Sequence, residues 1–141
     1  MSDIDELGGY IRDEEHLRAA YHALEPGYTV KPGLRNAVPY LDSGGHPTGL
    51  TNVEVTYTLH HPDQSLDFNT RTFQRLEEFW LANDYEIITR TVDQPYRVLR
   101  VRHTDEFTIA LKQGKTANLW LTASSAPVRR TRVQPPPPAL P

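Results

Sequence analysis

The stretch FTIALKQGKTANLWLTA, residues 107–123, holds two runs in which every second residue is apolar. A period of two is typical of strands with one buried face. Gly114, between Gln113 and Lys115, separates the two runs and predicts a tight turn. The apolar members of the runs are Phe107, Ile109 and Leu111, then Ala117, Leu119, Leu121 and Ala123. The pattern predicts an antiparallel pair of strands whose apolar face needs helices to cover it.

Three further strands are expected around this pair. Residues 53–59 alternate in the same way. Residues 85–92 and 96–102 are expected to pair across a turn at residues 93–95, and the turn residues 104–105 lead into the next strand. The sheet is therefore expected to hold about five strands.

Two helices are expected to cover the apolar face. The first is predicted over residues 13–25, capped by Asp13 and stopped by Pro26-Gly27, with an apolar stripe of Leu17, Ala20, Tyr21 and Leu24. The second carries Phe73, Leu76, Phe79 and Trp80 at helical spacing, with Asp67, Asn69 or Thr70 as candidate caps. Asn83 or Asp84 supplies the left-handed residue that ends it.

The remaining segments set the expected domain organisation. Residues 1–12 are expected to form an N-terminal arm, because Gly8-Gly9 interrupts any helix there. Residues 13–128 form a single domain with a long Gly- and Pro-rich loop at residues 26–50. Residues 129–141 are rich in Arg and Pro, which favours polyproline II and predicts a disordered tail.

The order of elements predicts the fold class. A helix, a strand, a second helix and four strands give an α+β fold, a two-layer sandwich in which both helices cover one face of a mostly antiparallel sheet. The expected order is α-β-α-β-β-β-β, and the helix-free face of the sheet is left open.

Composition narrows the expected class of protein. Hydrophobic residues make up 38% and charged residues 23% of the 141 residues, which is too apolar for a disordered chain. The net charge of −3 lacks the basic excess that favours nucleic acid, so no nucleic-acid partner is expected. No run is long and apolar enough for a membrane span, and no Cys is present for thiolate chemistry or disulfides.

The N-terminal sequence bears on location. Met1-Ser2-Asp3 opens the chain without the basic and apolar regions of a signal peptide. A cytoplasmic location is expected for the chain as given, and an extracytoplasmic one for a chain from which an upstream signal or membrane segment has been removed.

Residues 73–128 resemble the soluble domain of small actinobacterial lipoproteins and membrane-anchored extracytoplasmic proteins. The resemblance lies in the turn Ala82-Asn83-Asp84-Tyr85 after an amphipathic helix, in Thr104-Asp105-Glu106-Phe107 at the start of a strand, and in Ser124-Ser125-Ala126-Pro127-Val128 after the last strand. The lipobox and the Cys that many of these proteins carry near position 126 are absent here. The resemblance implies an extracytoplasmic domain of poorly defined function, with no catalytic residues to carry over.

Two short motifs contain potential metal ligands. His60-His61-Pro62-Asp63 lies at a strand end, where neighbouring side chains point to opposite faces, so a solvated strand end is expected there. His103-Thr104-Asp105 lies at a chain reversal, where Asp usually bonds its own backbone. Sequence alone does not say whether His60, His61 and His103 meet, nor where His46 lies. No metal site, cofactor or catalytic set is predicted from these patterns.

A basic patch with one aromatic residue is the candidate site. If the strands alternate without bulges, five side chains share the outward face of the sheet: Arg90, Arg100, Arg102, Lys112 and Trp120. Such a surface is typical of sheets that bind single-stranded nucleic acid, and equally of sheets that bind acidic peptides or polymers. The alternative is a set of edge charges that limits aggregation, with Trp120 covered by the long loop.

The leading hypothesis is a non-catalytic binding domain that contacts a protein or a cell-envelope component through this outer face. The alternative is a bacteriophage tail-completion or toxin-immunity accessory protein, and a small enzyme of unrecognised type is the third hypothesis.

Overall fold

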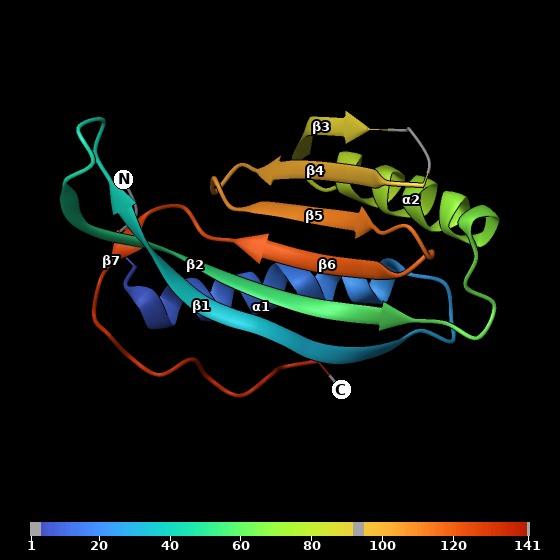
Figure 1. Cartoon of the computed structure of the whole chain (residues 1–141), viewed down its shortest axis with the longest axis horizontal. Coiled ribbons are helices and arrows are strands. Elements are labelled where there is room, and N and C mark those ends of the chain that lie inside the picture. The colour runs from blue at the N-terminus through green and yellow to red at the C-terminus, as the bar shows by residue number, and fades with distance from the viewer. Residues whose placement is uncertain (1–3, 92–94, 141) are drawn as a thin grey trace.

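The computed structural model describes residues 4–91 and 95–140 (Figure 1). Within these residues the chain forms two helices and seven strands. They are α1 (Glu6–Ala23), β1 (Thr29–Leu41), β2 (Pro47–His60), α2 (Leu66–Leu81), β3 (Tyr85–Thr91), β4 (Arg97–His103), β5 (Thr108–Gln113), β6 (Leu119–Ser124) and β7 (Val128–Arg129). Neither helix is long and apolar enough to cross a membrane.

The strands form one antiparallel sheet in the order β1-β2-β6-β5-β4-β3, and β7 pairs with the start of β2. Both helices lie on the same side of this sheet, α1 behind β1, β2 and β6, and α2 behind β3, β4 and β5 (Figure 1). The predicted α+β class, with two helices and an antiparallel sheet, is confirmed. The sheet has seven strands rather than about five.

The core lies between the sheet and the helices, as the alternation predicts. The inward side chains of β2, β5 and β6 are at most 1% exposed: Val55, Tyr57, Ile109, Leu111, Leu119 and Leu121. Leu17 of α1 and Leu76 and Trp80 of α2 are fully buried against them, and Tyr21 and Phe73 pack at the margin. This layer buries the largest apolar side chains of the fold and dominates its stability.

The first helix begins earlier than predicted. Asp5 caps it, because an Oδ1 atom of Asp5 accepts a hydrogen bond of 3.0 Å from the backbone of Gly8. The predicted break at Gly8-Gly9 is therefore wrong, and residues 6–12 of the predicted arm belong to α1, while residues 1–3 lie outside the described residues. Gly9 is needed for close packing, since a Cβ atom there would lie 2.6 Å from Cγ2 of Val53.

The second helix begins and ends close to the predicted positions. Ser65, rather than Asp67, Asn69 or Thr70, provides the N-cap. Asp84 has a φ of 69° and supplies the expected left-handed residue after the helix. The predicted turn at residues 93–95 lies partly outside the described residues, since 92–94 are not described.

The predicted long loop at residues 26–50 is instead a strand, a turn and the start of a second strand. β1 and β2 form a hairpin closed at Asp42, whose Oδ1 accepts from the backbone N–H groups of Gly44 and His46. Most residues of β1 are exposed, so the strand has no buried alternation. Pro32 and Pro39 are tolerated because β1 is an edge strand.

The Pro-rich tail lies against the body rather than extending freely. Leu140 is buried, and the backbone N–H of Ala139 donates to the Tyr57 hydroxyl at 3.1 Å. Arg35 donates to the Pro136 carbonyl at 2.8 Å and forms a 2.6 Å ion pair with the buried carboxylate of Glu14. The expectation of a disordered segment over residues 129–141 is not met over the described part, which ends at residue 140.

Asp13 is a charged residue type placed wholly inside the core. It is 0% exposed, and neither of its carboxylate oxygens has a hydrogen-bond partner among the described residues. Burial, reinforced by the negative charges of Glu14 and Glu54, raises the pKa of Asp13 well above its ordinary value. The folded protein therefore favours the protonated, uncharged form of Asp13.

Truncating the core tests the predicted strand register. Leu119→Ala removes a fully buried side chain and should lower the free energy of unfolding by about 2 to 5 kcal/mol. Leu34→Ala is the control, because Leu34 is 61% exposed and its loss should change stability by no more than about 0.5 kcal/mol. Urea unfolding measures both, and equal midpoints for the two variants would contradict the register.

Replacing Asp13 by Asn tests whether burial raises the pKa of Asp13. Because the folded-state pKa is raised, the unfolded chain ionises first as the pH rises, and the parent loses stability above about pH 4. Asp13→Asn removes this penalty, so its advantage in urea midpoint should be small at acidic pH and grow toward neutrality. Asp63→Asn, at an exposed position, should show no such growth. A pH-independent difference for Asp13→Asn would refute the assignment.

Candidate functional site

The helix-free face of the sheet carries four of the five side chains predicted for partner binding. Lys112 of β5 pairs directly with Trp120 of β6, and Arg100 of β4 pairs with Ala110 of β5. Because alternate residues of a strand share a face, Arg100 and Lys112 lie on the same side as Trp120. Arg102 follows two residues after Arg100 on that side. We call this helix-free side the outer face.

Two adjoining hollows shape the outer face. One, of about 370 Å3, is lined by Arg100, Lys112 and Trp120, with Leu34 of β1 at its side. The other, of about 440 Å3, includes Arg102 and the β1 residue Val38. Both hollows share Glu54, Thr108 and Ser124. The outer face is therefore a continuous trough across the middle strands, and we refer to it as the outer trough.

The cations of the outer trough differ in whether they already have a partner. Arg102 donates from Nη2 to Oε1 of Glu86 at 2.8 Å. The side chains of Arg100 and Lys112 form neither a hydrogen bond nor an ion pair with any described residue. Glu54 is the carboxylate that both hollows share. Two positive charges therefore lie beside a half-buried Trp120 without an ion-pair partner among the described residues.

Arg90 does not join this group. A register shift between Ile87 and Thr89 adds one residue to β3, so Arg90 pairs with the inward-facing Leu99. Its Nη2 atom forms a 2.7 Å ion pair with Oε2 of Glu77 on α2. The placement of Arg90 on the outer face assumed strands without bulges, and the β3 bulge turns the side chain to the helix side.

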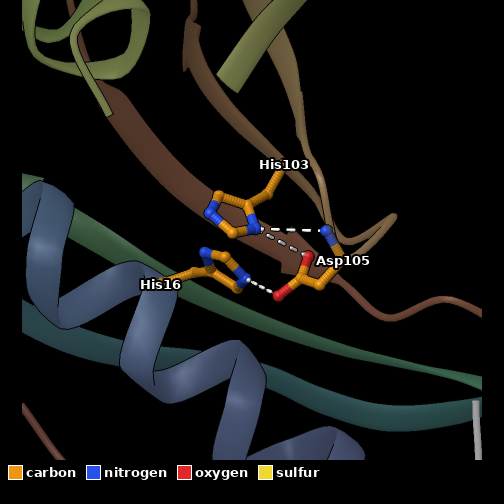
Figure 2. Close-up of side chains that lie close together, drawn as sticks. All are labelled: His16, His103 and Asp105. Carbon is orange, nitrogen blue, oxygen red and sulfur yellow. Dashed lines mark hydrogen bonds and ion pairs between the residues drawn. The ribbon is translucent and has the colours of Figure 1, made fainter. Parts of the chain in front are cut away.

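A second constellation lies at the opposite side of the sheet. His16 of α1, His103 at the end of β4 and Asp105 in the following turn come together from positions far apart in the chain (Figure 2). His16 Nε2 lies 2.8 Å from Asp105 Oδ2, and His103 Nδ1 lies 3.2 Å from Asp105 Oδ1. Their potential ligand atoms all lie within 4.8 Å of one another. We call these three residues the His-Asp cluster.

Two further side chains hold the His-Asp cluster in place. The Tyr85 hydroxyl lies 2.5 Å from His16 Nδ1, and Arg12 donates from Nε to Asp105 Oδ2 at 2.6 Å. The backbone N–H of Phe107 donates to Asp105 Oδ1 at 3.0 Å. The carboxylate is thus fixed by donors from two sides.

These contacts account for the ionisation of the cluster. Burial raises the pKa of Asp105, but the donors from Phe107, Arg12 and His16 outweigh it and lower the pKa to about 2. Burial lowers the pKa of His16, and burial raises the pKa of Tyr85 to about 12. Near neutral pH the set is therefore an ionised Asp105, a neutral His16 and a protonated Tyr85.

The other histidines singled out by the sequence lie elsewhere. His61 is buried rather than solvated: its Nε2 bonds the Pro26 carbonyl at 2.9 Å, and its ring packs 4.4 Å from that of Phe68. His60 points to solvent. His46 lies exposed in the β1–β2 turn beside Asp42. The only His that accompanies His103 in the cluster is His16.

The sequence contained one signal for His16. It stands three residues after Asp13, four before Ala20 and next to Leu17, so it falls on the buried stripe of α1. A polar residue on such a stripe indicates a buried partner. Nothing in the local sequence identifies that partner, because Asp105 is 89 residues away. The turn at residues 104–105 was predicted, and its contact with α1 was not.

Comparisons with known proteins give no functional assignment. No protein-family profile matches the chain, and no curated protein matches it. Among solved structures, the chain is similar to a DUF4853 family protein from Actinomyces odontolyticus ATCC 17982, with 15% sequence identity and a TM-score of 0.40. The similarity covers 100% of this chain and 78% of the other. At this level it transfers neither a function nor site residues.

Proposed function

We propose that this chain is a non-catalytic binding domain that takes an extended, acidic peptide segment of a partner in its outer trough. The observation that carries the proposal is a pair of cations, Arg100 and Lys112, that have no partner among the described residues and share a hollow with Trp120 on the sheet face without helices. A carboxylate bound there replaces water at both cations, and an apolar part of the peptide contacts the indole ring.

The shape of the trough favours an extended ligand over a compact one. The two hollows adjoin, and together they cross β2, β6, β5 and β4. Leu34 and Val38 of β1, 61% and 40% exposed, provide apolar surface beside the cations. An extended peptide fits such a surface because alternate side chains point the same way and contact the trough at regular intervals.

The burial of His16 supports the non-catalytic part of the proposal. A general base must reach a proton of the substrate within hydrogen-bond distance. Both ring nitrogens of His16 already have partners, and the residue is 2% exposed, while Tyr85 is 8% exposed. A substrate therefore has no access to the ring nitrogens of His16 in the ion-free cluster.

The class of partner rests on the resemblance of residues 73–128 to soluble domains of actinobacterial lipoproteins. If this chain belongs outside the membrane, the acidic segment belongs to a protein or another component of the cell envelope. This placement is part of the proposal.

A binding titration tests the proposed function. A fluorescein-labelled, glutamate-rich peptide should bind the full chain in a salt-sensitive manner, measured by fluorescence anisotropy. Replacing both Arg100 and Trp120 by Ser should weaken binding about tenfold or more, because contacts to charged groups are lost. Glu54→Gln should strengthen binding, because it removes a negative charge from the trough.

Arg90→Ser is the matched control, since it removes one arginine from the helix side of the sheet. Its affinity for the peptide should equal that of the parent. Equal weakening by Arg90→Ser and by the double variant would indicate a general charge effect and would refute a site in the outer trough. So would peptide binding that the double variant leaves unchanged.

A further inference from the structure

The His-Asp cluster has the composition and spacing of a metal site. It offers two imidazole nitrogens and a carboxylate oxygen within 4.8 Å of one another, from α1, from the end of β4 and from the turn that follows β4. Zinc bonds of about 2.0 to 2.2 Å place neighbouring ligand atoms roughly 3 to 3.6 Å apart. His103 Nδ1 lies 3.2 Å from Oδ1 of Asp105, which is within that range, and His16 Nε2 lies 2.8 Å from the other carboxylate oxygen, Oδ2. One ion bound by both rings therefore requires a turn of the carboxylate or of one ring, over separations of at most 4.8 Å.

The surroundings of the cluster supply the outer contacts that metal ligands require. A metal-binding His usually holds its second nitrogen by a hydrogen bond, and a metal-binding carboxylate is itself hydrogen-bonded. In the His16 tautomer protonated at Nδ1, that N–H donates a hydrogen bond to the Tyr85 hydroxyl, and Nε2 presents a lone pair to an ion. Arg12 holds Oδ2 of Asp105, which leaves Oδ1 to face His103.

His103 supplies a second argument. Its Nδ1 atom faces both the backbone N–H of Asp105 and Oδ1 of Asp105, each at 3.2 Å (Figure 2). A ring nitrogen carries either a proton or a lone pair, so only one of these contacts is a hydrogen bond in either state. When Nδ1 accepts from the backbone, two lone pairs face each other. A cation between His103 Nδ1 and Asp105 Oδ1 would accept both lone pairs and remove their repulsion.

The charges around the His-Asp cluster and its access to solvent are compatible with a bound cation. Arg12 lies close to the site, but Oε1 of Glu15 is 3.3 Å from its Nη1 atom and offsets its charge. A hollow of about 570 Å3, lined in part by Arg12, Thr104 and Asp105, opens beside the cluster. It provides an entry path and room for a water molecule as a further ligand.

We propose that His16, His103 and Asp105 bind one divalent first-row transition-metal ion, of which Zn2+ is the best match. Imidazole and carboxylate ligands without thiolate suit this class of ion. Bound there, the ion ties α1 to the turn between β4 and β5. The site lies apart from the outer trough, so the two proposals fail independently.

Calorimetric titration of the full, metal-stripped chain with Zn2+ tests the site. The parent should bind one ion, and Zn2+ should raise its melting temperature because the ion binds the folded state. His103→Ala should lower the affinity about 100-fold or more, and Tyr85→Phe, which removes an outer contact, should lower it about 10- to 100-fold with the stoichiometry unchanged. Co2+ should give the absorption bands of a bound ion in the parent and lose them in His103→Ala.

His46→Ala is the matched control, because His46 forms the other His-Asp pair, at 3.4 Å and exposed in the hairpin turn. It should bind Zn2+ like the parent. Circular dichroism checks the fold of each variant, and His103→Asn replaces His103→Ala if the latter unfolds. Absence of saturable binding in the folded parent, unchanged affinity in the His103 variant, or equal loss in His46→Ala would overturn the proposal.

Discussion

The strict alternation of β2, β5 and β6 is the constraint on which the rest of the structure depends. It places Tyr57, Leu111 and Leu121 on one side, where helices must exclude water from them. The other side of the same strands receives Thr56, Lys112 and Trp120 and has no helix over it. The core and the outer trough are therefore the two faces of one pattern, and a slip of one residue would exchange them.

The helix side is less uniform than this pattern suggests, because α1 buries polar as well as apolar groups. Glu14 is neutralised by Arg35 at 2.6 Å and accepts a hydrogen bond from the Tyr57 hydroxyl at 2.8 Å. His16 lies between Tyr85 and Asp105. The partners of Glu14 and His16 offset the free-energy cost of burying these two polar groups. They fix α1 to β1, to the tail and to the turn after β4 more specifically than apolar contacts do.

The sequence predicts those parts of the fold in which one face of an element is continuously apolar. Leu119 and Leu121 identify a strand, and Leu76 and Trp80 identify a helix, because burial follows a fixed period there. β1 was not predicted, because an exposed edge strand has no alternation of buried and exposed residues and tolerates a proline such as Pro32. The first turns of α1 were not predicted, because Gly9 has a low helix propensity and is required there by its close packing against Val53.

The candidate sites likewise divide into residues whose placement follows from a regular strand pattern and residues whose placement depends on tertiary packing. Arg100, Lys112 and Trp120 were correctly brought to one face because their strands keep a regular register. Arg90 was misplaced by a bulge that no local pattern reveals. The His-Asp cluster depends on a contact between residues 89 positions apart, and contacts of that kind are set by the packing of whole elements.

Tryptophan quenching tests the two-faced sheet most directly, because the chain has two tryptophans and the structure places them on opposite faces. Trp80 on α2 is 0% exposed in the core between the helices and the sheet, and Trp120 is half-buried in the outer trough. In the variant Trp80→Phe, acrylamide should quench Trp120, and a glutamate-rich peptide should protect it. In Trp120→Phe, Trp80 should resist quenching with or without peptide. Equal protection of both tryptophans in the free protein would show that the outer face is covered and would contradict the account.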